Sequence, residues 1–358
     1  MFLFIVLAVV FAGVAGSAAA PPQAPPIRFE EIAAKSGLRF ELRNGEAGGF
    51  HQIELTLGGV AALDYNNDGC ADVFFTNGAA IPSLRKTGPK FSNRLFRNNC
   101  DMTFTDVTAE AGLTGEGYNM AVAAGDMDND GFTDLFVAGV KGNALYRNLG
   151  NGRFADQTSP AGLITPDPRW AVSAGWFDYD NDGWLDLFIA NYVVWDAEKE
   201  PHCGTPERQY YCHPNAYRGL PNQLFHNNRD GTFSDVSQAS GIGRHTGKGM
   251  GVGFADMDGD GLTDVFVAND SVRGLLFHNR GNGKFEEIGL EAGVALRDDG
   301  HAIAGMGADF RDLDNDGKPD LLVSGILNDS FLLFRNLGGE NGFEDYAQRT
   351  GLLMSTRQ

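Results

Sequence analysis

The chain repeats one acidic nine-residue box five times, and this repeat limits its fold more than any other feature. Each copy fits the pattern D-x-[DN]-x-D-G-x-x-D, and the copies begin at Asp64, Asp126, Asp178, Asp256 and Asp312. Small residues precede each box, and apolar runs such as VFFTN and LFVAG follow it. Short apolar runs bounded by turn residues are typical of buried strands, so each box is predicted to join two strands.

Two further boxes complete each unit. One reads LFRNN, LYRNL, LFHNN, LFHNR or LFRNL, and the other begins at Phe104, Phe154, Phe233, Phe285 or Phe343 with a short helical turn at its end. Asn/Gly turns separate the two, which is a hairpin signature. Four strands per unit, repeated at intervals of 52 to 78 residues, predict an all-β β-propeller with five four-stranded blades. A row of separate small domains is the main alternative.

The acidic boxes have the chemistry of calcium loops. Oxygen ligands at positions 1, 3 and 5, Gly at position 6 and a backbone carbonyl at position 7 wrap Ca²⁺ in a short loop. Position 12, a bidentate Glu in an EF-hand, is apolar here, so the Asp at position 9 is predicted to close the site. The alternatives are a metal-free Asp/Gly turn and Mg²⁺, which needs a more rigid octahedron.

This pattern predicts up to five Ca²⁺ ions and a ligand set for each loop. The predicted side-chain ligands are Asp64, Asn66, Asp68 and Asp72; Asp126, Asp128, Asp130 and Asp134; Asp178, Asp180, Asp182 and Asp186; Asp256, Asp258, Asp260 and Asp264; and Asp312, Asp314, Asp316 and Asp320. The predicted backbone-carbonyl ligands are Cys70, Phe132, Trp184, Leu262 and Lys318.

Charge and the N-terminus restrict the partners. The 358 residues carry a net charge of −19, which argues against nucleic acid because phosphate binding needs a basic surface. Residues 2–14 form an apolar run too short for a comfortable membrane span and are followed by small residues, so 1–19 is predicted to be a signal peptide. An uncleaved anchor is the alternative. We expect a secreted, extracellular or periplasmic protein without membrane insertion after cleavage.

The boxes resemble the FG-GAP/VCBS repeats of integrin-α-like propellers, and more specifically the cartilage acidic protein and ASPIC/UnbV family. The resemblance rests on the DxDNDGxxDLF loops, the LFRNxGNGxFxDVTxxAGL hairpins and the stretch from Tyr211, YCHPNAYRGLPNQLF, in which His213 stands where the family usually has Gly. It covers residues 28–352 and implies a secreted calcium-binding propeller. Members usually continue through further blades to a C-terminal domain.

The count of boxes gives a related expectation. A sixth copy of the outer-strand box begins at Phe29, before any blade, whereas only five sets of the other strands follow. We therefore expect an incomplete, larger propeller of about seven blades, with a closed five-bladed ring as the alternative. The predicted organisation is a Pro-rich spacer at 20–27, repeats at 28–352 interrupted by an insertion at 190–222, and a tail at 353–358.

Other candidate sites are fewer. Four Cys in a secreted chain favour disulfides. Cys203 and Cys212 are expected to pair within the insertion, and Cys70 and Cys100 are candidates for a second bridge. A zinc site at His202-Cys203 and Cys212-His213 is a weaker alternative. The predicted ligand face comprises Trp195, Tyr210, Tyr211 and Tyr217 around the insertion.

No catalytic motif is recognisable, so the chain is predicted not to be an enzyme. His226 and His278, at a position that is Arg in other copies, are interpreted as variable surface residues. The predicted function is a secreted calcium-binding module for an extracellular protein or glycan. The alternatives are a polysaccharide lyase or hydrolase, for which His301 and Arg311 are the candidate residues, and a non-binding structural part of a longer protein.

Overall fold

The computed structural model describes residues 28–164, 169–205, 207–326, 329–339, 342–352 and 356. The predicted signal peptide and spacer lie outside these residues, as does most of the tail predicted at 353–358. Within these ranges, no helix has both the length and the apolar character needed to cross a membrane.

Five antiparallel sheets of four strands each form the body of the molecule, as predicted from the repeats. Blade 1 contains β1 (Val60–Leu63), β2 (Asp72–Phe75), β3 (Arg94–Asn98) and β4 (Phe104–Asp106). Blade 2 contains β5 (Tyr118–Gly125), β6 (Asp134–Val140), β7 (Ala144–Asn148) and β8 (Phe154–Asp156). Blade 3 contains β9 (Ala171–Phe177), β10 (Asp186–Asn191), β14 (Gln223–Asn227) and β15 (Phe233–Asp235). Blade 4 contains β17 (Gly249–Ala255), β18 (Asp264–Asn269), β19 (Leu275–Asn279) and β20 (Phe285–Glu287). Blade 5 contains β21 (Gly305–Arg311), β22 (Asp320–Gly325), β23 (Leu332–Asn336) and β24 (Phe343–Asp345).

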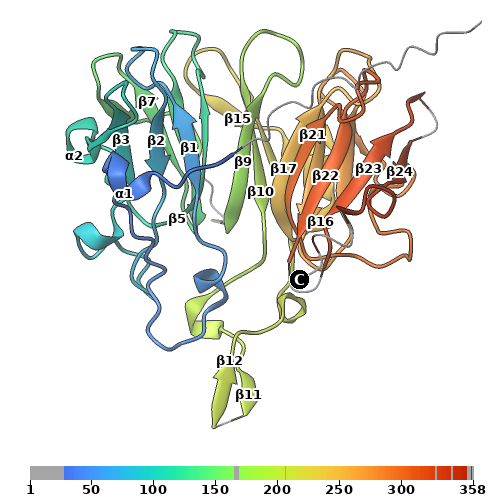
Figure 1. The fold of residues 1–358 in the computed structure, drawn as a ribbon, viewed down its shortest axis with the longest axis horizontal. Helices are drawn as coiled ribbons and strands as arrows, with labels where there is room; N and C mark the ends of the chain where they lie inside the picture. The colour runs from blue at the N-terminus through green and yellow to red at the C-terminus, as the bar shows by residue number, and fades with distance from the viewer. Residues whose placement is uncertain are drawn as a thin grey trace, which may run out of the picture.

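The chain crosses each blade in sequence order, so every acidic box joins the first two strands of its blade. All five boxes therefore lie at the same end of the propeller, the upper end in Figure 1. Short α-helices follow some outer strands: α2 (Thr108–Ala111) follows β4 and α3 (Ser237–Ser240) follows β15. The structure thus confirms the predicted fold of a β-propeller with four-stranded blades.

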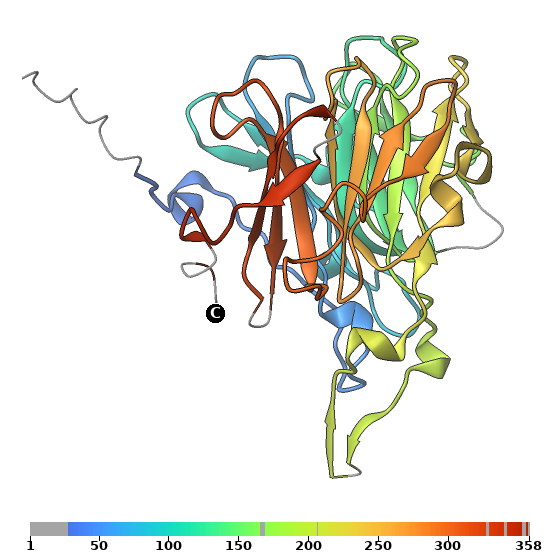
Figure 2. The same ribbon diagram turned by 90° about the vertical axis from the view of Figure 1, so that its right-hand side faces the viewer.

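The core consists of apolar clusters between neighbouring blades. Separate clusters join blades 1 and 2, blades 2 and 3, blades 3 and 4, and blades 4 and 5. None of these four clusters joins blade 5 to blade 1, and Val60 on the innermost strand of blade 1 is 60% exposed. A fifth cluster lies at the end that carries the insertion and spans several blades. The described blades therefore form an arc, seen from two directions in Figures 1 and 2, and the alternative of a closed five-bladed ring is wrong for them.

The segment before blade 1 takes the place of the outer end of a preceding blade. It includes α1 (Ala33–Ser36), which ends at Gly37 with a φ of 84°. A Cβ at Gly37 would lie 3.0 Å from the Phe104 carbonyl oxygen, and the equivalent Gly112 has the same relation to Phe154 of the next blade. Phe29, the equivalent of these two Phe residues, is 96% exposed and belongs to no strand.

The opposite end of the propeller carries the insertion of blade 3, between β10 and β14. It contains the 3₁₀ helices η3 (Ala197–Lys199) and η4 (Pro214–Ala216), and the strands β11 (Cys203–Thr205), β12 (Arg208–Tyr210) and β13 (Leu220–Pro221). β13 pairs with β16 (Thr246–Gly247), whereas β11 and β12 form a hairpin that projects away from the blades (Figure 1). The base of the insertion packs on the N-terminal segment around η1 (Gln52–Glu54). Two further 3₁₀ helices, η2 (Pro89–Phe91) and η5 (Ile242–Arg244), complete the elements described.

Candidate metal centres

The five acidic loops share one hydrogen-bonded turn. In the second loop the two carboxylate oxygens of Asp126 accept from the backbone N–H of Asp130 at 3.1 Å and of Gly131 at 2.8 Å. The Asp130 carboxylate accepts from the N–H of Phe132 at 3.0 Å. The same bonds recur in the other four loops. These bonds close the nine residues into a turn, with the position-6 Gly in the left-handed conformation that the predicted loop requires.

The turn brings predicted ligand oxygens together. Carboxylate oxygens of Asp126, Asp128 and Asp134 lie within 4.8 Å of one another, and so do those of Asp178, Asp180 and Asp182. Position-3 oxygens in two loops, Asn66 Oδ1 and Asp128 Oδ1, are buried without a hydrogen-bond donor. Hard oxygen ligands at this spacing, with acceptors left unpartnered, are a donor set suited to Ca²⁺.

The Asp at position 9 also holds the loop against the blade. Asp72, Asp134, Asp186, Asp264 and Asp320 are all buried. In the second loop Asp134 accepts from the N–H of Met127 at 3.0 Å and from that of Asn148 on β7 at 2.7 Å. Burial raises the pKa of Asp134 to about 7, with the nearby Asp128 and Asp130 adding to the rise and the two backbone N–H groups opposing it. A cation between these carboxylates would stabilise the ionised form.

A basic side chain from the third strand of the blade reaches four of the loops. Arg147 contacts Asp128 at 2.6 Å and Asp130 at 3.0 Å, and Arg335 contacts Asp314 at 2.6 Å. His226 and His278 occupy the same position in blades 3 and 4, where their Nδ1 atoms lie 3.2 Å from Asp186 and 2.9 Å from Asp264. The interpretation of these two His as variable surface residues is therefore wrong, because they face the acidic loops and His278 is buried.

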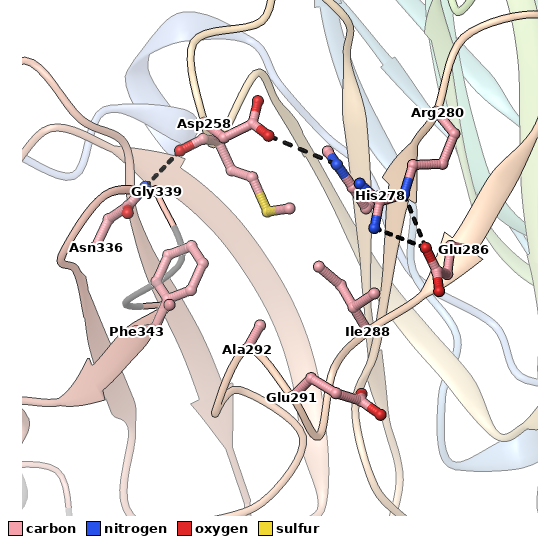
Figure 3. Close-up of a pocket in the computed structure, with 12 residues that line it drawn as sticks. Asp258, His278, Arg280, Glu286, Ile288, Glu291, Ala292, Asn336, Gly339 and Phe343 are labelled. Atoms are coloured by element: carbon pink, nitrogen blue, oxygen red, sulfur yellow. Dashed lines mark hydrogen bonds and ion pairs between the residues drawn. The ribbon is translucent and has the colours of Figure 1, made fainter.

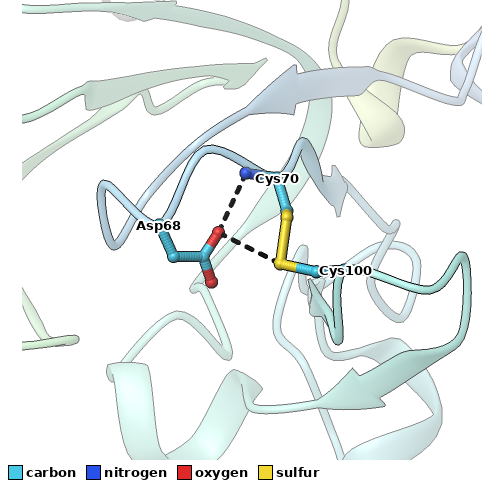
Figure 4. Close-up of side chains that lie close together, drawn as sticks. All are labelled: Asp68, Cys70 and Cys100. Atoms are coloured by element: carbon cyan, nitrogen blue, oxygen red, sulfur yellow. Dashed lines mark hydrogen bonds between the residues drawn. A yellow bond between two sulfur atoms is a disulfide. The ribbon is translucent and has the colours of Figure 1, made fainter.

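The first loop is held by a disulfide in place of such an ion pair. Cys70 and Cys100 are bonded, and Figure 4 shows Asp68 beside them. The Asp68 Oδ1 atom accepts from the Cys70 N–H at 2.9 Å and lies 3.9 Å from Cys100 Sγ. The bridge fixes position 7 of the loop to the turn between β3 and β4.

A further set of site residues is the Asn present in every third-strand box, whose role the sequence alone does not reveal. The Asn that ends the third strand of each blade is buried, and in blades 2 to 5 its Nδ2 atom donates to the position-2 carbonyl of the preceding loop. Asn148 donates to Tyr65 at 2.8 Å, and Asn336 donates to Met257 at 2.8 Å. Asn227 and Asn279 make the equivalent bonds. These residues position each acidic loop against the next blade.

A cavity of about 490 Å³ borders the fourth loop, between blades 4 and 5 (Figure 3). Ile288, Ala292 and Phe343 form an apolar part of its lining, and Arg280 and Glu286 form an ion pair at 2.6 Å on another side. Asp258 and His278 of the fourth loop also line the cavity, with their facing atoms 3.6 Å apart. The fourth loop thus has an open space beside it.

The predicted ligand face does not exist as a surface. Trp195 and Tyr217 are only 6% and 8% exposed, and both donate hydrogen bonds to the buried carboxylate of Glu200. Tyr211 donates to Glu54 at 2.8 Å, which leaves Tyr210, at 57%, as the exposed ring of the four. The aromatic side chains are needed to pack the insertion on the N-terminal segment, which is why they turn inward.

Two further expectations have clear outcomes. Cys203 and Cys212 form a disulfide, as expected, so their sulfur atoms are not free to act as zinc ligands. His301 and Arg311, the candidates for an enzyme, are exposed, and each is ion-paired with a nearby Asp. They do not form a buried pair.

Comparison with known proteins places the repeats in a family. The FG-GAP-like repeat family matches residues 64–137, 126–189, 215–267 and 256–323, which together cover more than half of the chain. The chain is 35% identical to human cartilage acidic protein 1 over 115 residues, which are 32% of this chain and 16% of that protein. It is 29% identical to the mouse protein over 175 residues, which are 48% of this chain and 24% of that protein.

The matched region thus spans a quarter or less of the length of these relatives. Among solved structures, a lectin of Agrocybe aegerita described as recognising non-reducing terminal N-acetylglucosamine aligns with a TM-score of 0.42 and 19% identity, over 82% of this chain and 68% of that one. This TM-score is too low for the likeness to bear on the ligand. The repeats, the acidic loops and the family match agree, and the chain belongs to the FG-GAP-like repeat family of integrin-α-like proteins.

Proposed function

We propose that this chain is an extracellular, non-enzymatic binding module whose propeller is stabilised by Ca²⁺ in its acidic loops. The observation that carries the proposal is the convergence of carboxylate oxygens within 4.8 Å of one another in the second and third loops; the second loop also leaves the position-3 oxygen Asp128 Oδ1 without a donor. The side chains at positions 1, 3, 5 and 9 of each loop would hold the ion, and the position-7 carbonyl would complete the set. The ion supplies charge neutralisation and fixes the loop.

Two disulfides support an oxidising compartment, which for this chain means an extracellular or periplasmic one. The density of negative charge supports the metal assignment. Several carboxylates within one nine-residue turn repel one another, and the ion pairs of Arg147 and Arg335 neutralise only part of that charge.

The test is the thermal midpoint of the full mature chain in about 1 mM Ca²⁺, in the same concentration of Mg²⁺, and in chelator. Sites with a Kd of about 10⁻⁴–10⁻³ M would each add about 0.4–1.4 kcal/mol at this concentration, so five would add roughly 2–7 kcal/mol. We expect a rise of several degrees with Ca²⁺ and a smaller one with Mg²⁺.

The variant Asp126→Asn removes one ligand and should reduce the Ca²⁺-dependent rise. Asp309→Asn, an exposed change on β21 outside the loops, is the matched control and should leave the rise intact. A midpoint that is the same in Ca²⁺ and chelator would show that the loops bind no structural calcium.

The partner is proposed to be an extracellular protein or glycan that contacts the projecting β11–β12 hairpin. Tyr210 is the exposed aromatic side chain of this hairpin, and Tyr is favoured at binding surfaces because its ring is apolar and its hydroxyl is polar. Binding to glycan arrays and intact cell surfaces in Ca²⁺ should be lost in Tyr210→Ser. It should persist in Phe29→Ser, which removes an exposed ring far from the hairpin. Equal binding by the two variants would exclude the hairpin as the contact.

A further inference from the structure

The fourth residue of each acidic loop is a turn residue that links one loop to the next. Asn67, Asn129 and Asn181 have φ values of 56°, 55° and 58°, in the left-handed region that Asn tolerates better than most residues. Their side chains point out of their own loops. The Nδ2 atoms donate to the position-6 Gly carbonyl of the following loop, at 2.9, 3.0 and 2.8 Å.

Each acceptor carbonyl belongs to a peptide group that also reaches a predicted metal ligand. Asn67 donates to the carbonyl of Gly131, and the N–H of the same peptide group, on Phe132, donates to Asp130 Oδ1 at 3.0 Å. Asn129 is linked in the same way, through Gly183, to Asp182. A single peptide unit therefore separates the turn of one loop from the position-5 carboxylate of the next. Hydrogen bonds in such a chain polarise one another.

The chain of links stops at one point. The fourth residue of the fourth loop is Gly259, with a φ of 82° and no side chain to donate. No hydrogen bond of this kind joins the fourth loop to the fifth among the described residues. The buried Asn link from the third strand is nevertheless present at this boundary, through Asn336 and Met257. The interruption is thus specific to the loop tips.

We propose that Asn67, Asn129 and Asn181 couple cation binding in the first four loops, and that the fifth loop binds independently of them. This inference rests on the proposed calcium function. A cation held by positions 3 and 5 fixes the turn at position 4 and so directs the Asn amide. That amide then orders the peptide group that orients the position-5 carboxylate of the next loop. A cation bound in one loop thereby lowers the free energy needed to order the next loop for binding, which is positive coupling.

The test measures the calcium dependence of each loop separately, by hydrogen exchange of the loop amides followed by mass spectrometry on the full mature chain. The perturbation is Asp182→Asn, which removes a ligand from the third loop. We expect the midpoint Ca²⁺ concentration of the second and fourth loops to rise roughly two- to fivefold, the equivalent of about one ordinary hydrogen bond, and that of the fifth loop to stay unchanged.

Asn129→Gly supplies the decisive comparison, because Gly adopts the same backbone conformation but cannot donate. In the Asn129→Gly background, Asp182→Asn should no longer shift the second loop, although it should still shift the fourth. Asn315→Gly is the matched control. Its residue has the same left-handed backbone in the fifth loop, so it should change neither response.

The outcomes separate the two proposals. If Ca²⁺ protects the loops but Asp182→Asn leaves the midpoint Ca²⁺ concentrations of the second and fourth loops unchanged, the proposed coupling is wrong and the proposed calcium function stands. A shift of the second loop that survives Asn129→Gly would overturn the assigned role of this Asn. No protection of any loop by Ca²⁺ would overturn the proposed function itself.

Discussion

Glu200 should hold the insertion on the propeller, and replacing it should release that contact. Its side chain is largely buried and accepts from Trp195 Nε1, from the Tyr217 hydroxyl and from His51 Nδ1, the last at 3.1 Å. Glu200→Ala removes the acceptor and leaves these groups buried and unpaired. Breaking a buried charged hub in this way costs about 3–5 kcal/mol.

Glu200→Gln should lower the free energy of unfolding much less than Glu200→Ala, because the groups that donate to Glu200 can still be paired. The amide oxygen can still accept from Trp195, which can only donate, while the Tyr217 hydroxyl can rotate and accept from the amide NH₂. We expect a loss of about 0.5–1.5 kcal/mol, close to the net value of one ordinary hydrogen bond. Glu198→Ala, an exposed change in η3, the short helix that Glu200 follows, is the control and should fall within about 0.5 kcal/mol of the parent.

The assay is urea unfolding at saturating Ca²⁺, combined with hydrogen exchange of residues 195–205 and 207–222. The second measurement is needed because the insertion could open locally before the blades unfold. We expect the loss of stability to increase in the order Glu198→Ala, Glu200→Gln, Glu200→Ala. An Ala variant as stable and as protected as the parent, or a Gln variant as damaged as the Ala variant, would refute it.

Three further predictions concern the acidic loops. First, the folded-state pKa of Asp134 is raised to about 7 by burial, above its unfolded value, so protonation favours the folded chain and metal-free stability should fall as pH rises from about 4 through 7. Urea unfolding of metal-free protein from pH 5 to 8 checks this, and a flat or rising profile contradicts it. Second, replacing Cys70 and Cys100 together by Ser should cost about 2–4 kcal/mol, because the bridge joins residues 30 apart in sequence and restricts the unfolded chain. The same double change at Cys203 and Cys212, which are 9 residues apart, should cost less in urea unfolding, and a reversed order would argue against chain entropy as the cause. Third, Gly259→Asn should stabilise the chain by about 0.5–1.5 kcal/mol if the new amide reaches the fifth loop as its three counterparts reach theirs. A destabilised variant would show that the turn at this boundary requires Gly.

The fold was predictable because the repeat states the same local pattern five times. Each copy of the acidic box, of the third-strand box and of the outer-strand box specifies its own strand and turn, so the sheets follow without knowledge of distant contacts. The hydrogen bonds within each loop follow equally from its spacing, since they join residues two to seven positions apart.

The insertion was not predictable in the same way. The partners of Glu200 and Tyr211 on the N-terminal segment are about 150 residues away in sequence, and no periodic signal links the two regions. Aromatic residues in a variable insertion can face solvent or pack inward, and only the contact partner decides between these states. The roles of His226 and His278 could have been found, because every third-strand box has a basic residue at this position.

The arrangement of the blades in an arc determines which neighbouring blades are destabilised when one blade unfolds. Four of the five apolar clusters each join two adjacent blades, so at these interfaces stability is close to a sum of nearest-neighbour contributions, as in a linear array. The fifth cluster, at the end that carries the insertion, spans several blades. A blade in the middle of the array loses two interfaces when it unfolds, whereas blade 5 loses one of those described. A defect in blade 3 would therefore weaken two of these interfaces at once. An equal defect in blade 5 would fray one end and leave the other four blades in register.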